Sequence, residues 1–312
     1  MNTRVGVVIP CYRSAGTITS LVDGILTTLD EAGKSTLVML VDDASPDEGA
    51  CWRALESLCS RHGPRVRALR LARNVGQHGA LLCGMAALPD DVVTVITMDD
   101  DGQHRPADLP ALIAAVDAGT DLVIGAYDEK HHAAGRNLGG ALVDHTLRRL
   151  FDLPSDFVLT SLRAMKRFVA DDALEEAGSH TYLTAALLDA TANRINVPVT
   201  HVPRREGRSG YTLSRSLRLA ANLALSHSRL PVMAMMGIGV LFFVVTLASL
   251  VYVLWLRIST DGVIPGWASL MLMIGIQSTM LVAGLATILL YVARSHRILT
   301  GVRKRWRIAD ER

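Results

Sequence analysis

Residues 92–106 read VVTVITMDDDGQHRP, an apolar run of mainly β-branched residues that ends in three consecutive aspartates. Such a run is typical of a buried β-strand. Asp99, Asp100 and Asp101 repel one another, so their adjacency needs a reason. In an extended chain successive side chains point to opposite sides, which places Asp99 and Asp101 on one face and Asp100 on the other. The triplet is therefore interpreted as a carboxylate pair with a spacer.

Two carboxylates on one face favour a cation between them. Hard divalent ions such as Mg²⁺ are commonly held by one or two carboxylates together with the phosphates of a bound molecule. The alternative is a solvated acidic turn that caps a helix beginning at Pro106. The spacing alone leaves both interpretations open.

Short β-branched runs also occur elsewhere in the first half of the chain, separated by helix-like stretches. This alternation predicts an α/β domain around a mostly parallel sheet, whose ligands bind beyond the carboxyl ends of the strands. Polar clusters follow three of the strands (PCYRS, DDASPD and DDDGQH), and we expect them to converge on one site. The predicted strands are residues 5–10, 36–42, 66–71, 92–98 and 121–126.

The four cysteines show neither C-x-x-C pairing nor metal-ligand spacing, which indicates buried thiols in a reducing compartment. They are Cys11, Cys51, Cys59 and Cys83. The adjacent His131 and His132 cannot face one ion from a regular helix, so they are interpreted as loop residues. A net charge of +2 gives no sign of a nucleic-acid partner, and none is expected.

Two long uncharged segments, residues 232–256 and 262–293, lie in the last third of the chain. A helix of about 20 apolar residues can cross a bilayer. Helices of soluble cores rarely stay uncharged on every face, so two transmembrane helices are predicted. Residues 212–231 repeat leucine and alanine at helical spacing with interleaved arginines, which predicts an amphipathic helix in the membrane interface.

The charges that flank these segments predict their orientation. Basic residues cluster before the first segment and after the second, while the connecting loop carries only Arg257. By the positive-inside rule, the domain of residues 1–211 and a basic tail of residues 294–312 are both cytoplasmic, with residues 232–293 as a two-helix membrane domain. VGVVIP is too short for the hydrophobic region of a signal peptide, so none is expected.

The chain resembles a known family in an ordered set of motifs: VVIPCYRS, LVDDASPD, RNVGQHGALLCGM, TMDDDGQHRP, LRAMKR and RREGRSGY, followed by two membrane spans. These are similar to family 2, GT-A type glycosyltransferases that load a sugar onto polyprenyl phosphate. The group includes dolichol-phosphate mannose synthases, undecaprenyl-phosphate glucosyltransferases and the aminoarabinose transferase of lipid A modification. The resemblance covers nearly the whole chain.

This resemblance implies a GT-A fold, a Mg²⁺ or Mn²⁺ cofactor, a homo-oligomer and a place in the inner (cytoplasmic) membrane. It also implies transfer from a nucleotide-sugar, UDP-linked by preference, to polyprenyl (undecaprenyl) phosphate with inversion. The sugar stays open. The alternatives are a GDP-mannose-dependent dolichol-phosphate-mannose-type synthase and, from another class, an inactive scaffold or lipid-handling membrane protein.

The resemblance also assigns donor-site roles to individual residues. Asp43 would hydrogen-bond uracil, although a turn or N-cap residue before Ser45 is the alternative. The chain departs from many relatives at Arg13 and Ser14, where they have Asn-Glu. The other implied roles are Pro10 and Tyr12 against the base, Asp99 and Asp101 at the ribose and the metal, and Gln103 beside them.

The acceptor phosphate would be held by Arg136, Arg204 and Ser209, with Asp101, Arg136 and Arg204 as the catalytic set. Arginine suits this role because its planar fork matches phosphate oxygens. A basic surface attracted to anionic lipid is the alternative for the arginines near the membrane. Gly210 replaces the lysine of the family motif R-x-x-G-x-S-K-Y.

Asp156 lies one place from the position of the family's usual aspartate. An inverting transfer to a hydroxyl needs a base, but a phosphomonoester has a second pKa of about 6 and is mostly dianionic at neutral pH. We therefore expect Asp156 to orient an arginine or a sugar hydroxyl and not to act as a general base.

Overall fold

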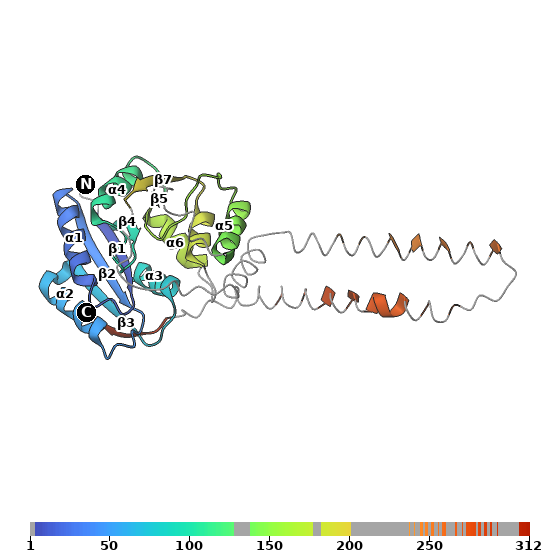
Figure 1. Cartoon of the computed structure of the whole chain (residues 1–312), viewed down its shortest axis with the longest axis horizontal. Helices are drawn as coiled ribbons and strands as arrows, with labels where there is room; N and C mark the ends of the chain where they lie inside the picture. Colours follow the sequence, from blue (N-terminus) through green and yellow to red (C-terminus); the bar gives the residue numbers. More distant parts are fainter. Residues whose placement is uncertain are drawn as a thin grey trace. The chain divides into compact units, whose positions relative to one another are not determined.

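A computed structural model of the chain describes residues 4–127, 138–176, 182–200 and 306–312, with scattered residues between 237 and 292. Its contacts divide the chain into two compact units. One unit comprises Met1–Arg218 and Val302–Arg312, and the other is Leu219–Gly301. The first unit contains the α/β domain of Figure 1.

The described strands form an eight-stranded sheet in the order β7-β5-β6-β4-β1-β2-β3-β8. The pairings β1–β2, β2–β3, β1–β4 and β5–β7 are parallel, and only β6 and β8 run antiparallel to their described neighbours. The strands are β1 (Arg4–Cys11), β2 (Ser35–Asp42), β3 (Val66–Leu71), β4 (Val92–Thr97), β5 (Leu122–Tyr127), β6 (Arg163–Lys166), β7 (Arg194–Val199) and β8 (Ile308–Glu311). The five strands predicted from sequence are thus confirmed as β1 to β5, and the sheet is mostly parallel.

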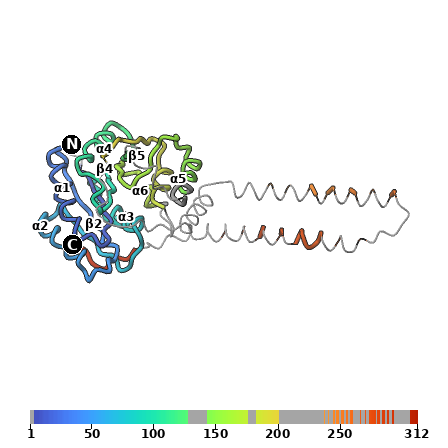
Figure 2. The backbone as a smooth tube through the Cα atoms, viewed as in Figure 1, coloured from blue at the N-terminus to red at the C-terminus, as the bar shows by residue number. Residues whose placement is uncertain are grey.

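Helices cover both faces of this sheet (Figure 2). One hydrophobic cluster joins the sheet to α1, α2 and α4, and a second joins it to α3, α6 and α7. The helices are α1 (Ile18–Glu31), α2 (Ala50–His62), α3 (Gln77–Ala86), α4 (Leu109–Asp117), α5 (Leu138–Leu150), α6 (Arg167–Glu176) and α7 (Leu183–Ala190). Short 3₁₀ turns, Gly63–Arg65 and Pro106–Asp108, precede β3 and α4.

Strand β1 is buried on both faces. Val7 and Ile9 belong to the cluster beneath α1, and Val8 belongs to the cluster beneath α3. All three side chains have no exposed surface. A strand in the middle of a parallel sheet is covered by helices on both sides, which explains why its sequence is continuously apolar and not alternating.

Helix α3 lies very close to the sheet because of Gly84. A Cβ atom at this position would overlap the side chain of Val8 and lie 2.9 Å from Cγ2 of Val41. The absence of a side chain therefore lets α3 rest directly on β1 and β2. This contact fixes the first residue of the helix, Gln77, with respect to the carboxyl edge of the sheet.

The cysteines are all free thiols, as the sequence predicted. Cys11, Cys51 and Cys83 are buried, while Cys59 is partly exposed. Burial raises the pKa of Cys11, Cys51 and Cys59, which keeps these thiols protonated and unreactive at neutral pH.

The end of the chain belongs to the sheet. Sequence analysis places residues 294–312 in a tail outside the catalytic domain, whereas Ile308–Glu311 forms β8 along the edge of β3. Backbone hydrogen bonds join Ala68 to Arg312 in both directions, and Ala72 N–H donates to Arg307 O. The sequence IADE gives little strand signal because an edge strand needs no buried face, only unpaired backbone groups on its neighbour.

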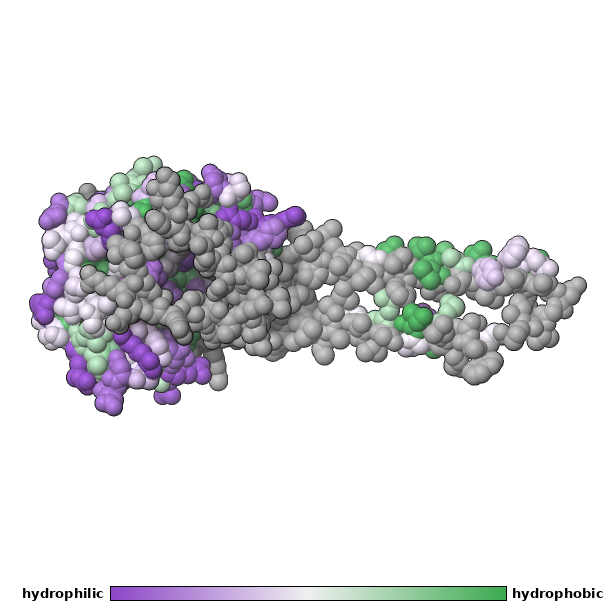
Figure 3. All heavy atoms as spheres, viewed as in Figure 1, coloured by the Kyte–Doolittle hydropathy of each residue, from purple (hydrophilic) through white to green (hydrophobic). Residues whose placement is uncertain are grey.

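In the second unit, the described residues include large exposed apolar side chains such as Val240, Tyr252 and Trp255. Figure 3 shows hydrophobic (green) atoms among the described residues of this unit. Among the residues that the structure describes, no helix is long and apolar enough to cross a bilayer. The predicted spans, residues 232–256 and 262–293, lie largely outside the described residues. The predicted interfacial helix, residues 212–231, lies entirely outside them.

Replacing Gly84 by alanine should destabilise the α/β domain, because the added methyl group overlaps Val8 beneath α3. We expect the free energy of unfolding to fall by about 1–3 kcal/mol, the usual cost of overpacking a core. Gly16→Ala is the matched control, since a Cβ there meets nothing within 4 Å. Thermal unfolding of both variants measures the difference, and equal midpoints would contradict the close approach of α3.

Candidate active site

Three polar segments meet at the carboxyl edge of the sheet, as the sequence predicted. Tyr12 N–H donates to Asp100 Oδ2 over 3.0 Å, and Thr17 Oγ1 donates to Asp100 O over 2.7 Å. Arg13 N–H donates to Ser45 Oγ over 3.0 Å. The segments after β1, β2 and β4 are therefore hydrogen-bonded into one edge.

Pro10 and Tyr12 lie at the end of β1. Pro10 is buried within the strand, opposite Val41 of β2 in the register of the pair. Tyr12 is 46% exposed, and the Arg13 guanidinium lies 5.6 Å from the centre of its ring. Arg13 adopts a left-handed backbone conformation with φ of 59°, which is uncommon for a residue other than glycine.

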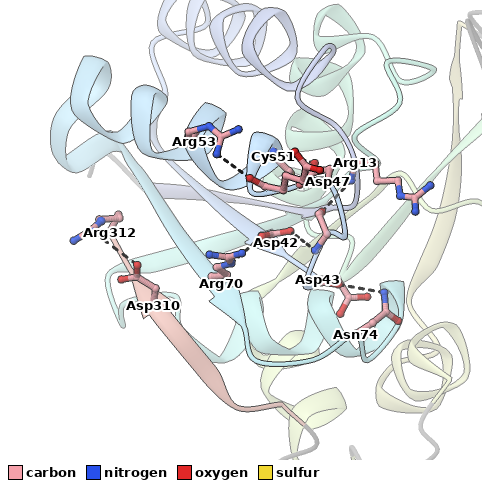
Figure 4. A network of polar contacts seen from close by, with 12 residues as sticks. Arg13, Asp42, Asp43, Asp47, Cys51, Arg53, Arg70, Asn74, Asp310 and Arg312 are labelled. Carbon is pink, nitrogen blue, oxygen red and sulfur yellow. Dashed lines mark hydrogen bonds and ion pairs between the residues drawn. The ribbon is translucent and has the colours of Figure 1, made fainter.

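Asp43 anchors the segment that joins β3 to α3. Its carboxylate accepts the backbone N–H groups of Val75 (2.7 Å) and Gly76 (2.8 Å). Asn74 Nδ2 donates to the carbonyl oxygen of the same aspartate over 3.2 Å (Figure 4). Burial raises the pKa of the Asp43 carboxyl, and the two N–H donors partly offset this effect. The side chain thus links the ends of two neighbouring strands.

The turn role considered for Asp43 belongs to its neighbour Asp42. Asp42 Oδ1 accepts the N–H of Ser45 over 3.0 Å, and Arg70 Nε lies 3.6 Å from its other oxygen (Figure 4). In the first turn of α2, the N–H of Cys51 donates to Asp47 Oδ2 over 2.9 Å. Asp43 is therefore not needed for either local task.

The aspartate triplet lies beyond β4, which ends at Thr97. Asp99 Oδ1 accepts from Gln77 Nε2 over 2.6 Å, and Asp99 Oδ2 accepts from Ser161 Oγ over 2.5 Å. Asp101 Oδ1 accepts the N–H of Gln103 over 3.1 Å. Asp100 turns instead to the first segment, where it accepts from Tyr12, so its contacts differ from those of both neighbours.

Asp99 and Asp101 both affect the pKa of Tyr127 through their negative charge. Burial, and then the negative charges of Asp99, Asp101 and Asp108, raise the pKa of Tyr127 at the end of β5. Within the described residues, no three histidine, cysteine or acidic side chains are grouped so that they could hold a metal ion. The Asp99 and Asp101 carboxylates still offer the hard oxygen ligands that Mg²⁺ and Mn²⁺ bind.

His104 has a structural position in this segment. Its Nδ1 accepts the N–H of Asp99 over 3.2 Å, and its ring stacks on Tyr127 with the ring centres 6.0 Å apart. Gly102 turns the chain with a φ of 74°. Sequence analysis gave His104 no role, and its contacts show that it holds the aspartate segment in place.

A buried arginine and a half-buried histidine near Asp99, Arg163 and His78, were not predicted. Arg163 of β6 is 5% exposed, and its Nη2 donates to Thr184 Oγ1 over 2.8 Å. The ring of His78 meets that of Tyr182 edge to face, with centres 4.7 Å apart. Burial lowers the pKa of His78 to about 4, and the positive charge of Arg163 acts in the same direction. Both residues occur in the motifs quoted above, but nothing in a local pattern brings them together.

Asp156 is exposed on the segment between α5 and β6. Arg148 of α5 fixes this segment by donating to the carbonyl oxygens of Pro154 (2.6 Å), Ser155 (3.1 Å) and Phe157 (2.7 Å). The predicted phosphate-binding residues Arg136, Arg204 and Ser209 lie outside the described residues, as do His131 and His132.

Comparisons with known proteins identify what this arrangement is similar to. The model of the family "Glycosyl transferase family 2" matches residues 6–173, more than half of the chain. An undecaprenyl-phosphate 4-deoxy-4-formamido-L-arabinose transferase of Edwardsiella ictaluri (strain 93-146) is 28% identical over 279 residues, covering 88% of this chain and 85% of the relative. The protein of the same name from Enterobacter sp. (strain 638) is 27% identical over 280 residues, covering 88% and 84%.

Solved structures show the same fold. Glucosyl-3-phosphoglycerate synthase from Mycobacterium tuberculosis, crystallised with Mn²⁺ and UDP-glucose, superposes with a TM-score of 0.50 at 20% identity, covering 72% of this chain and 78% of that chain. A mycobacterial protein gives a TM-score of 0.51 at 20% identity, covering 70% and 73%. The α/β domain therefore has the GT-A fold.

The low pKa of His78 predicts a loss of stability in acid. The folded chain binds fewer protons at this site than the unfolded chain between pH 6.5 and about 4. Stability is therefore highest above pH 6.5, where His78 is neutral in both states. The free energy of unfolding falls as the pH drops through this window, by up to about 3 kcal/mol. The free energy of unfolding, measured against pH, should fall less steeply for His78→Phe than for the wild type. Parallel curves would contradict the buried neutral imidazole.

Proposed function

The chain belongs to glycosyl transferase family 2, and we propose that it transfers a sugar from a UDP-sugar to polyprenyl phosphate, with undecaprenyl phosphate as the acceptor lipid. The observation that carries this proposal is the meeting of Tyr12, Asp43 and the Asp99–Asp101 pair at one edge of a GT-A sheet. Relatives that cover most of the chain are named as transferases to undecaprenyl phosphate, and this supports the acceptor. The products are polyprenyl-phosphate-sugar, with inversion at the anomeric carbon, and free nucleotide.

The nucleoside of the donor would lie against Pro10, Tyr12 and Asp43. The exposed ring of Tyr12 offers a flat surface for a base. Asp43 accepts two backbone N–H groups, but a carboxylate has about four lone-pair positions and can accept a further hydrogen bond. The imino N–H of uracil is a suitable donor for it.

The ribose and the diphosphate would lie over the aspartate pair. Asp99 and Asp101 supply oxygen ligands for Mg²⁺ or Mn²⁺, with Gln103 beside them and the donor phosphates completing the coordination. The bound ion would offset the negative charge of the departing nucleoside diphosphate. Asp100 has no part in this, since it holds the first segment through Tyr12.

The acceptor phosphate would bind to Arg136, Arg204 and Ser209. Their task is to align one phosphate oxygen with the anomeric carbon, opposite the leaving group. At neutral pH this oxygen carries no proton that must be removed. Asp156 is then left to orient an arginine or a sugar hydroxyl.

The membrane would supply the lipid acceptor from the cytoplasmic side. The uncharged segments, residues 232–256 and 262–293, are the proposed transmembrane helices, and residues 212–231 the interfacial helix. Residues 1–211 and the C-terminal strand β8 would both be cytoplasmic. The pairing of β8 with β3 agrees with this, because two strands of one sheet must lie on the same side of the membrane. We also propose a homo-oligomer in the inner membrane.

Product analysis tests the proposed function. Membranes that contain the chain are incubated with undecaprenyl phosphate and a panel of labelled UDP- and GDP-sugars, and the labelled lipid is identified. A lipid-linked sugar formed from one UDP-sugar is the expected result. Labelling from GDP-mannose alone would favour a dolichol-phosphate-mannose-type synthase. No labelled lipid and no nucleotide release with any donor would contradict catalysis and support a scaffold.

Asp101→Asn should lower the rate of metal-dependent transfer by about 100-fold or more, because an ion ligand near the leaving group is lost. Asp100→Asn is the matched control. Its amide oxygen can still accept from Tyr12 N–H, so its loss should be much smaller. Initial rates at saturating Mn²⁺ measure both variants, and equal losses would refute the assignment of Asp100 as a spacer.

The pH profile of transfer tests the role of Asp156. If the acceptor phosphate is its own nucleophile, wild type and Asp156→Asn should both rise in rate near the second phosphate ionisation, at about pH 6. They should differ only by a factor that does not depend on pH.

A different result would identify Asp156 as the general base, which typically contributes roughly 10²- to 10⁴-fold. The wild type would then show an additional acidic limb that Asp156→Asn removes, and added formate or azide would restore the rate of the variant.

A further inference from the structure

The segment between β3 and α3 contacts both acidic parts of the donor site. Val75 and Gly76 donate their backbone N–H groups to the Asp43 carboxylate. The next residue, Gln77, donates its side-chain amide to Asp99 Oδ1 over 2.6 Å. Three consecutive residues thus link the carboxylate proposed for the base to the first carboxylate of the aspartate pair.

The other oxygen of Asp99 is held by a residue that comes later in the chain. Ser161, which precedes β6, donates its hydroxyl to Asp99 Oδ2 over 2.5 Å. The carbonyl oxygen of Ser161 in turn accepts from Thr97 Oγ1, at the end of β4, over 3.0 Å. Ser161 is therefore fixed to the strand that precedes Asp99, and the Asp99 carboxylate is hydrogen-bonded on both oxygens.

Both donors are neutral, and this matters for the chemistry. An arginine or lysine at either position would compete with a cation for Asp99, whereas an amide and a hydroxyl orient the carboxylate without adding positive charge. Each oxygen also keeps a lone pair for another partner. In metal sites, groups that hydrogen-bond a ligating carboxylate in this way fix its direction and contribute to affinity.

We propose that Gln77 and Ser161 are positioning residues that hold the Asp99 carboxylate in the direction required by a nucleoside diphosphate and its divalent cation. The segment from Val75 to Gln77 then joins Asp43, proposed for the base, to Asp99, proposed for the cation. Neither residue touches the reacting atoms. This inference rests on the proposed function, because it assigns Asp99 to the donor site.

A purely structural role would have different consequences. Gln77 is the first residue of α3, so its bond to Asp99 could serve only to fix the start of that helix. In that case its removal would lower the stability of the ligand-free chain and would affect binding only to the same extent. The test therefore needs a binding measurement and a stability measurement on the same variants.

The variants are Gln77→Ala and Ser161→Ala in the full chain, and the probes are UDP and Mn²⁺. Thr160→Val is the matched control, because this neighbouring hydroxyl donates to Gly125 O over 2.7 Å and not to Asp99. Electron paramagnetic resonance of free Mn²⁺ at fixed UDP measures cation binding. Calorimetric titration measures UDP binding, and thermal unfolding without ligand measures stability.

Gln77→Ala and Ser161→Ala should each weaken binding of Mn²⁺ with UDP by about 10-fold or more, within the 10- to 100-fold range typical of such supporting groups. The unfolding midpoints of these variants should match that of the wild type, and Thr160→Val should bind as the wild type does.

Wild-type binding by Gln77→Ala and Ser161→Ala would overturn the inference while leaving the proposed function intact. If Thr160→Val bound as weakly as these variants, the structural role would be favoured and the inference overturned. The same conclusion would follow if the variants that bind more weakly also had lower unfolding midpoints. A wild-type chain that does not bind Mn²⁺ in the presence of UDP would contradict the proposed function itself, and the inference with it.

Discussion

A strand that is buried on both faces can place polar side chains only beyond its ends. Strand β1 is such a strand, with Val7 and Ile9 under one layer of helices and Val8 under the other. Because β1, β2 and β4 are parallel neighbours, their carboxyl ends lie at the same edge. The burial of this sheet therefore determines where every acidic residue of the candidate site is found, and Gly84 lets α3 approach closely enough to take part.

The edge is held together by hydrogen bonds between segments that are distant in sequence. Asp100 binds the backbone of Tyr12, Asp43 binds that of Val75 and Gly76, and Asp99 is bound from two further segments. Adjacent acids thus have separate tasks. Asp42 and Asp100 stabilise turns and loops, whereas Asp43, Asp99 and Asp101 are the carboxylates that we propose for binding the nucleotide-sugar.

The first five strands could be predicted because each is a β-branched run bounded by turn residues. The last three could not. RAMK of β6 is short and carries charges at both ends, RINVPV of β7 contains a proline, and IADE of β8 pairs only at the sheet edge. In the site, the acids were visible as consecutive aspartates that follow a strand. Gln77 and Ser161 were not, because their importance comes from contacts across 22 and 62 positions of the chain.

The central claim is that one edge of the sheet holds the nucleotide, with the segment from Val75 to Gln77 joining the carboxylate proposed for the base to the first carboxylate proposed for the cation. A cryo-electron microscopy structure of the full chain with UDP and Mn²⁺ tests it most directly. The account predicts the base against Tyr12 and Asp43 and the ion bound by Asp99 and Asp101, with Gln77 and Ser161 still on Asp99. A nucleotide bound elsewhere, or an ion held without Asp101, would contradict it.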